Sequence, residues 1–146
     1  MIKKQGNSIS LKLIDGIPLM KIIGKLSDIR EPDLNWELFA KVNGLQGVKT
    51  LLLDISDLHG RPGIVSTYYH VRECPYYDLF SKIAIIDRIE NKDYYSFHEN
   101  TANNAGHNIR YFTEAEEAMS WLKKNTAGSS AGKFTAFPFS EELVSI

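Results

Sequence analysis

The stretch that decides the fold is Leu51-Leu52-Leu53-Asp54-Ile55-Ser56-Asp57-Leu58-His59-Gly60, in the middle of the chain. Three consecutive leucines followed by acidic residues, a serine and a glycine predict a strand that is buried on both faces and ends in a polar loop. Unbroken apolar strands are typical of parallel sheets that helices cover on both sides. In such sheets, binding sites gather where the strands end. The stretch therefore predicts both the architecture and the place of a site.

Toward the N-terminus, the sequence predicts a β-hairpin followed by a helix. Apolar and polar residues alternate over 8–14, which is the period of a half-buried strand. Asp15-Gly16 suits the positive φ angles of a tight turn, and residues 17–23 form the returning strand. A helix is then predicted between about Asp28 and Val42, because its apolar residues share one helical stripe.

Toward the C-terminus, strands and helices alternate with short links. The predicted elements are a helix from Ile64 to about Glu73, an apolar strand 83–87, a helix from about Lys92 to Ala105, a strand 109–112, and a last helix that begins with a Thr113/Glu116 capping box. This order predicts an α/β layered fold with right-handed crossovers. We expect a mixed, mainly parallel sheet of about five strands, with the first strand antiparallel, and about four helices.

Length and composition indicate one ordinary globular domain. The chain has 146 residues, of which 43% are hydrophobic and 24% charged, and its formal net charge is -1. Such a balance gives no bulk attraction to nucleic acid or to an anionic membrane, so neither is an expected partner. Cys74 is the only cysteine, which excludes an internal disulfide and fits a reducing cytoplasm. No apolar run approaches membrane-spanning length, so no integral membrane segment is expected.

The end of the chain differs in composition from the rest. We place the domain at residues 1–125, and a Gly/Ser spacer with an aromatic tail at residues 126–146. Six large apolar residues follow the spacer: Phe134, Phe137, Phe139, Leu143, Val144 and Ile146. They predict that the tail docks onto its own domain or onto a second copy, as in a homodimer. A docking peptide for another protein and an unstructured end are the alternatives.

Polar residues at the predicted strand ends are the first candidate site. Asp54, Ser56, Asp57 and Asp87 should lie together, because the ends of neighbouring parallel strands meet at one edge of a sheet. Paired acids there could bind a cation or carry out acid/base chemistry. The alternative, which we favour, is that they cap loops and the helices that follow.

The second candidate is the segment before the predicted helix at residue 64. His59, Gly60 and Arg61 lie where helix N-terminal amides favour an anion, and Arg61 could bind carboxylate or phosphate through two hydrogen bonds. Ser66 and Thr67 supply hydroxyl groups about one turn into that helix. The alternative is a solvated turn without a ligand.

Motifs for catalysis and for cofactors are missing from the sequence. No Gly-x-Ser-x-Gly nucleophile elbow and no phosphate-binding or dinucleotide fingerprint occurs. His70 and Cys74 are spaced i, i+4, but zinc needs a second pair of ligands. We therefore predict no cofactor, no metal and no catalytic residue. The segments 68–70 and 76–80 are rich in tyrosine, which suits a pocket rim, a protein contact or core packing.

The element order resembles that of the SpoIIAA-like family of the STAS superfamily, and so do the runs 51–60, 82–87, 110–112 and 117–122. This family is also described beside the CRAL-TRIO lipid-binding domains. The resemblance covers about residues 9–122 and implies a small α/β domain that acts by binding. In anti-sigma antagonists of this superfamily, Asp-Ser-Ser-Gly follows the central strand and carries a phosphorylated serine. Here residues 58–63 contain no hydroxyl group, so that switch is not carried over.

These observations together predict a non-catalytic cytoplasmic module that binds or regulates a protein partner. A small anionic or lipid-like ligand near His59 to Thr67 and Asp87 would fit the same prediction. One alternative is a carrier of CRAL-TRIO-like type, with an apolar pocket between the second and third helices. The other is a small enzyme that uses the strand-end acids and His59.

Overall fold

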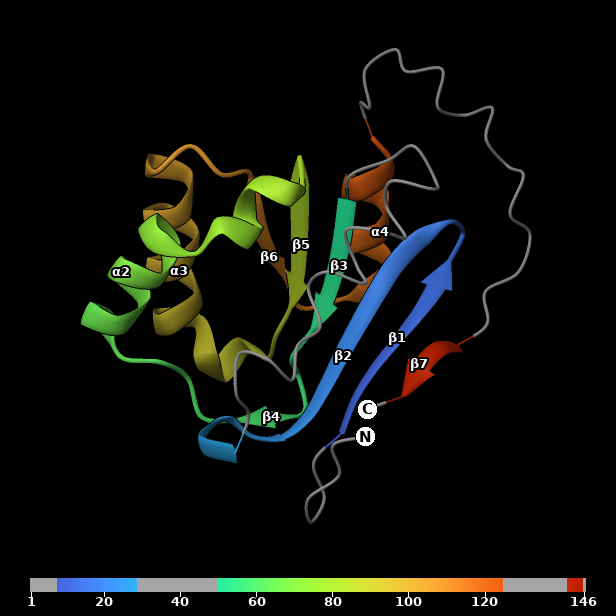
Figure 1. The fold of residues 1–146 in the computed structure, drawn as a ribbon, viewed down its shortest axis with the longest axis horizontal. Coiled ribbons are helices and arrows are strands. Elements are labelled where there is room, and N and C mark those ends of the chain that lie inside the picture. The colour runs from blue at the N-terminus through green and yellow to red at the C-terminus, as the bar shows by residue number, and fades with distance from the viewer. Residues whose placement is uncertain (1–7, 29–49, 125–141, 146) are drawn as a thin grey trace.

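The computed structural model describes residues 8–28, 50–124 and 142–145, which form a sheet with helices on both faces (Figure 1). The helices and short 3-10 segments are η1 (Leu26–Asp28), α2 (Ile64–Glu73), η3 (Pro75–Leu79), η4 (Ile89–Asn91), α3 (Lys92–Asn104) and α4 (Ala115–Lys123). The strands are β1 (Ser8–Ile14), β2 (Ile17–Lys25), β3 (Thr50–Asp54), β4 (Leu58–His59), β5 (Lys82–Ile86), β6 (Ile109–Phe112) and β7 (Glu142–Ser145).

The described strands form one sheet in the order β6-β5-β3-β2-β1-β7, and β4 pairs with β2. The pairs among β2, β3, β5 and β6 are parallel, whereas β1 runs antiparallel to both β2 and β7. The prediction of a mixed, mainly parallel sheet that opens with a hairpin is confirmed. Two strands were not predicted, namely β4 inside the polar loop and β7 at the end of the tail.

The hairpin turn has the conformation that its sequence predicts. Asp15 and Gly16 both have positive φ, at 52° and 79°, and Ile14 pairs directly with Ile17. Positive φ at both central residues is the requirement of a two-residue turn whose twist matches that of the strands. The turn therefore sets the register of β1 against β2.

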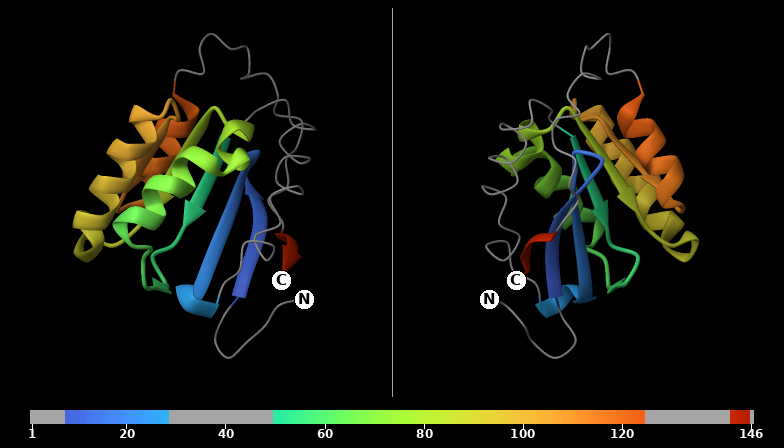
Figure 2. Two further views of the ribbon diagram at one scale, coloured as in Figure 1. Left: turned by 60° about the vertical axis from the view of Figure 1, so that its left-hand side comes forward. Right: turned by 90° about the vertical axis from the view of Figure 1, so that its right-hand side faces the viewer.

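The leucine strand is buried on both faces, as predicted. Leu51 is 0% exposed and belongs to the core under α2 and α3, whereas Leu52 is 2% exposed and belongs to the core under α4. Consecutive side chains of a strand point to opposite faces of the sheet, so neighbouring leucines supply both cores. Figure 2 shows the resulting layers, with α2 and α3 on one face of the sheet and α4 on the other.

The described helices lie where the sequence places them, with one correction. The capping box predicted for α4 is wrong, because the N-cap residue is Glu114 and no side chain caps this helix. The helix starts one residue later than the box requires, so Thr113 lies outside the cap position. The helix predicted from about Asp28 to Val42 lies outside the described residues except for Asp28, which ends η1. Residues 126–141 and 146 of the predicted tail also lie outside them.

Candidate functional site

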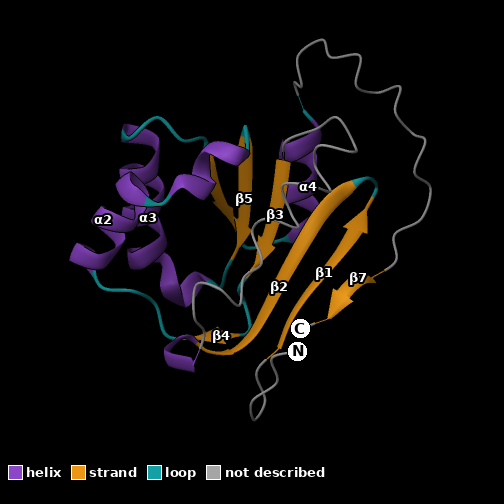
Figure 3. Ribbon diagram, viewed as in Figure 1, coloured by secondary structure: helices purple, strands orange, loops and turns teal. Residues whose placement is uncertain are grey.

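The predicted acids lie at the edge of the sheet where β3 and β5 end, and Figure 3 shows β4 beyond the end of β3. Asp54 Oδ1 accepts hydrogen bonds from Ser56 N at 3.0 Å and from Ser56 Oγ at 2.6 Å. Lys21 Nζ lies 3.8 Å from Asp54 and 3.6 Å from Asp57, whose other oxygen lies 3.5 Å from Arg88. These contacts are those of a loop cap, in which the acids hold the turn after β3.

Arg61 forms the centre of this edge. Its Nε and Nη2 atoms donate to Asp87 Oδ2 and Oδ1 at 3.1 and 2.6 Å. The same guanidinium donates to the carbonyl oxygens of Ile55, Leu58 and Gly60. A guanidinium has five N–H donors, and these five bonds use all of them. All N–H donors of Arg61 are therefore occupied within the chain, so an external anion could bind Arg61 only by displacing these bonds.

Asp87 receives more bonds than the pair with Arg61 alone. Its side chain is 0% exposed, and the Arg61 side chain is 8% exposed. Asp87 Oδ1 also accepts hydrogen bonds from the backbone N–H of Arg88 at 2.7 Å and from Asn91 Nδ2 at 2.9 Å. A buried ion pair is tolerated when its remaining lone pairs and protons are also bonded. The pair thus locks the segment before α2 onto the end of β5.

The predicted residues around the start of α2 are divided between solvent and core. Gly63 is the N-cap of α2, and no side chain caps this end. Ser66 faces solvent, whereas Thr67 is buried. Gly60 has φ of 97°, and a Cβ there would lie 3.4 Å from Leu26 Cβ. The structure therefore brings Gly60 to the strand-end edge but does not bring the two hydroxyl groups together.

A small hollow of about 190 Å³ opens at the same edge. It is lined by Ser56, Leu58, His59, Gly60, Arg88, Glu90 and Asn91. Ser56, His59 and Gly60 are predicted site residues, whereas the residues after β5 were missed. A signal for them was present, because Asp87-Arg88-Ile89-Glu90-Asn91 is a mostly polar run directly after an apolar strand, like the run after Leu53. His59 and Glu90 are exposed, so this hollow is open to solvent.

A hydrogen-bonded chain of histidine and tyrosine side chains, exposed at His70 and buried at His98 and Tyr111, was also missed. Tyr77 Oη lies 3.1 Å from His70 Nδ1 and 3.0 Å from His98 Nε2, and His98 Nδ1 lies 2.7 Å from Tyr111 Oη. The chain joins α2, η3, α3 and β6. The tyrosine-rich segments 68–70 and 76–80 held a partial signal, since they contain His70 and Tyr77, but His98 and Tyr111 lie far from both along the chain.

Burial sets the protonation states of His98 and Tyr111 within this hydrogen-bonded chain. Removal from water lowers the pKa of His98 to about 4, and nearby His70 acts in the same direction. Burial also raises the pKa of Tyr111 well above its ordinary value. At neutral pH, His98 is therefore a neutral imidazole that donates one hydrogen bond and accepts the other. His98 and Tyr111 therefore link α3 to β6 without carrying charge.

Among residues 8–28, 50–124 and 142–145, no group of three or more His, Cys, Asp or Glu side chains is placed to hold a metal ion. None of the helices in this part of the chain has the length and apolar character that a membrane crossing needs.

Comparison with known proteins yields a structural likeness. No family model matches the sequence, and no curated protein matches it either. The chain is similar to the crystal structure of an uncharacterized protein of the DUF3478 family from Shewanella loihica PV-4, which has a SpoIIAA-like fold. The identity is 20%, the match covers 84% of this chain and 98% of that chain, and the TM-score is 0.47. The fold that this crystal structure is described as having is the one that the sequence resembles.

Proposed function

We propose that this chain is a non-catalytic cytoplasmic binding module that contacts a protein partner through the outer face of α2. The observation that carries the proposal is the exposure of that helix. Five large hydrophobic side chains of the described residues are exposed, and four of them lie on α2: Ile64, Val65, Tyr68 and Tyr69. Single exposed hydrophobic residues are normal, but a cluster of them marks an interaction surface.

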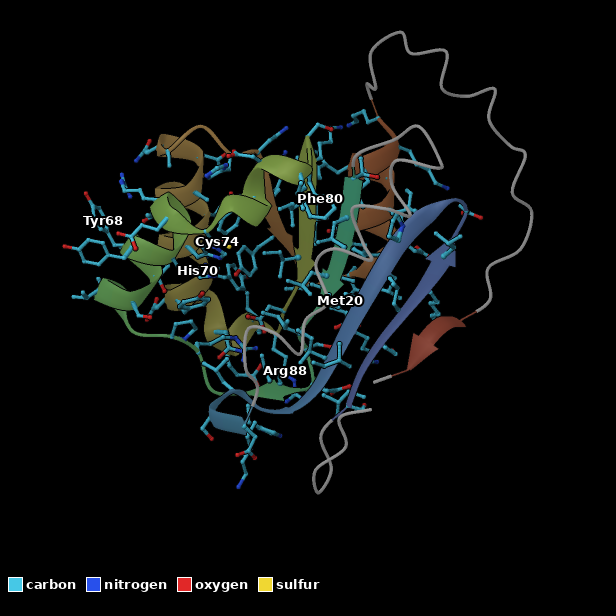
Figure 4. All side chains as sticks on the ribbon, viewed as in Figure 1. Met20, Tyr68, His70, Cys74, Phe80 and Arg88 are labelled. Atoms are coloured by element: carbon cyan, nitrogen blue, oxygen red, sulfur yellow. The ribbon has the colours of Figure 1, made fainter. Side chains whose placement is uncertain are left out.

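The composition of this face suits recognition of a protein. Tyr68 and Tyr69 pack edge to face with ring centroids 5.4 Å apart, and the Arg72 guanidinium lies 3.9 Å from the Tyr68 ring centroid. Tyrosine and arginine are enriched among the residues that dominate binding energies at protein interfaces. Figure 4 shows Tyr68 projecting from α2 away from the sheet. Such an exposed apolar helix face fits a partner with an apolar groove.

The strand-end edge supports this proposal because its contacts hold the start of α2 in place. The Arg61–Asp87 pair holds the segment before α2, and Val71 packs the helix against the core. A rigid helix loses little conformational entropy when it binds, which strengthens binding. The acids at this edge are engaged in the loop and in ion pairs, so they support a structural role better than acid/base chemistry.

A matched pair of variants tests the proposal in the full chain. Ile64 on α2 is 68% exposed and Ile89 on η4 is 60% exposed, so Ile64→Glu and Ile89→Glu place the same charge at equally open positions. We expect tagged wild type and Ile89→Glu to retain the same partner from a lysate of the source organism, and Ile64→Glu to lose it. All three should have the same circular dichroism spectrum. A partner retained equally by all three folded proteins would refute the proposal.

The same preparation separates a protein partner from a bound small molecule. Native mass spectrometry of the gently purified wild type should give the mass of the chain alone. A stoichiometric lipid or acid in that spectrum would instead favour the carrier alternative.

A further inference from the structure

The two edges of the sheet are closed in different ways. At the β6 edge, the side chains of α3 occupy the outward backbone groups. Asn103 Nδ2 donates to the Ile109 carbonyl at 3.0 Å, and the Tyr111 N–H donates to Glu99 Oε1 at 3.0 Å. Covering an edge strand in this way prevents another strand from pairing with it. The β6 edge is therefore closed by the domain itself.

Among the described residues, β7 is the element that closes the β1 edge. The register joins Ser10 to Ser145, Leu11 to Val144 and Lys12 to Glu142, with an irregularity between Leu11 and Lys12. β1 has seven residues, so this pairing covers less than half of the strand. Figures 1 and 2 show β7 beside β1 at the margin of the sheet. This short and irregular ladder contributes few backbone hydrogen bonds compared with the pairing of β1 with β2.

The connection to β7 is long. Residues 124–141 separate it from α4, and β7 lies next to β1, which is far from it in sequence. An element joined through a long connection can occupy the same position on a second copy, because every contact of the closed form is then reproduced between copies. Little free energy has to be gained for such an exchange, because the same contacts between β7 and β1 form in either case.

We propose that the β1 edge accepts β7 from a second copy of this chain, which gives a strand-exchanged homodimer. A second copy is the occupant that the geometry favours, because its β7 already matches the irregular register at Leu11 and Lys12. A foreign strand would have to match that irregularity anew. The proposal does not depend on the role of α2, which lies on the far side of the sheet from β7 (Figure 1).

Concentration decides between the two forms. Within one chain, β7 is present at an effective concentration on the order of mM, so the closed monomer dominates in dilute solution. The exchanged dimer should accumulate as the protein concentration approaches that value.

A disulfide cross-link between two single-cysteine variants detects the exchange. In a Cys74→Ser background, Ser10→Cys and Ser145→Cys proteins are mixed at high concentration and oxidised. Directly opposite residues of antiparallel strands lie at the separation that a disulfide needs. Only β7 from another copy can bring positions 10 and 145 of different chains together, so we expect a heterodimer linked at these positions, identified by mass spectrometry.

The control uses the same strand one step away. Ser8 lies on the same face of β1, but it pairs with Ile23 of β2 and has no β7 partner in the register. We expect Ser8→Cys to give several-fold less cross-linking with Ser145→Cys than Ser10→Cys does. Adding Val144→Pro to the Ser145→Cys chain should abolish the selective link, because proline cannot donate to the ladder. Equal yields from positions 8 and 10, or a link that survives Val144→Pro, would overturn the proposal.

Discussion

Acidification should destabilise this protein through His98, and the size of the effect follows from its burial. The side chain is buried between Tyr77 and Tyr111, with the Tyr94 ring 5.8 Å away, and its pKa is lowered from 6.5 to about 4. An unfolded chain with a pKa of 6.5 binds the proton more readily than the folded chain does. The contribution of neutral His98 to the free energy of unfolding is therefore complete above pH 6.5 and is lost as the pH falls through 4.

The magnitude can be worked out from the shift. Each pKa unit corresponds to about 1.4 kcal/mol, so a shift from 6.5 to about 4 is worth about 3 kcal/mol. About 2 kcal/mol of this should already be lost at pH 5, because the unfolded state is then almost fully protonated. A loss of this size is a large fraction of the stability of an ordinary domain.

Urea unfolding at several pH values between 7 and 4 measures the effect, with His98→Gln as the variant without the titrating group. The difference in unfolding free energy between wild type and His98→Gln should shrink by about 3 kcal/mol over this range. His59 is exposed, so His59→Gln is the control, and it should follow wild type at every pH. A difference between wild type and His98→Gln that does not change with pH would show that the reasoning about burial is incorrect.

Two further predictions concern the strand-end edge. Arg61→Met should lower the unfolding free energy by about 3–5 kcal/mol, because it leaves Asp87 buried without its ion-pair partner. Adding Asp87→Leu should recover part of this loss. A decrease below about 1 kcal/mol for Arg61→Met would contradict the role assigned to the pair. Gly60→Ala should cost about 1–3 kcal/mol, because φ is 97° there. Gly63, with φ of -74° and open space around a Cβ, is the control, and Gly63→Ala should cost less in the same chemical denaturation. Equal losses from the two glycine variants would argue against backbone strain at Gly60.

The sequence predicted the features that depend on neighbours along the chain. The alternation in 8–14 and the Asp15-Gly16 turn define the hairpin, because residue period and φ preference are local properties. The end of α2 at Glu73 follows in the same way from the Cys74-Pro75 stop. The location of a polar edge after Leu53 could also be predicted, since parallel strands must end together.

The partners of the polar residues at that edge could not be predicted. Arg61 looked available to an anion, and its engagement by Asp87 depends on the end of a strand 26 residues away. The exposure of Ile64 and Val65 was missed for the same reason, because apolar residues at a helix start are usually expected to pack against the sheet.

What the sequence determined by itself is therefore the set of elements, their order and the edge where polar residues gather. Only the tertiary structure decided that Arg61 and Asp87 neutralise each other, that His98 is buried against Tyr111, and that β7 closes the β1 edge. The physical reason is the range of the forces involved. Backbone propensity and side-chain period act over a few residues, whereas burial, ion pairing and strand pairing depend on which distant segments the fold brings together.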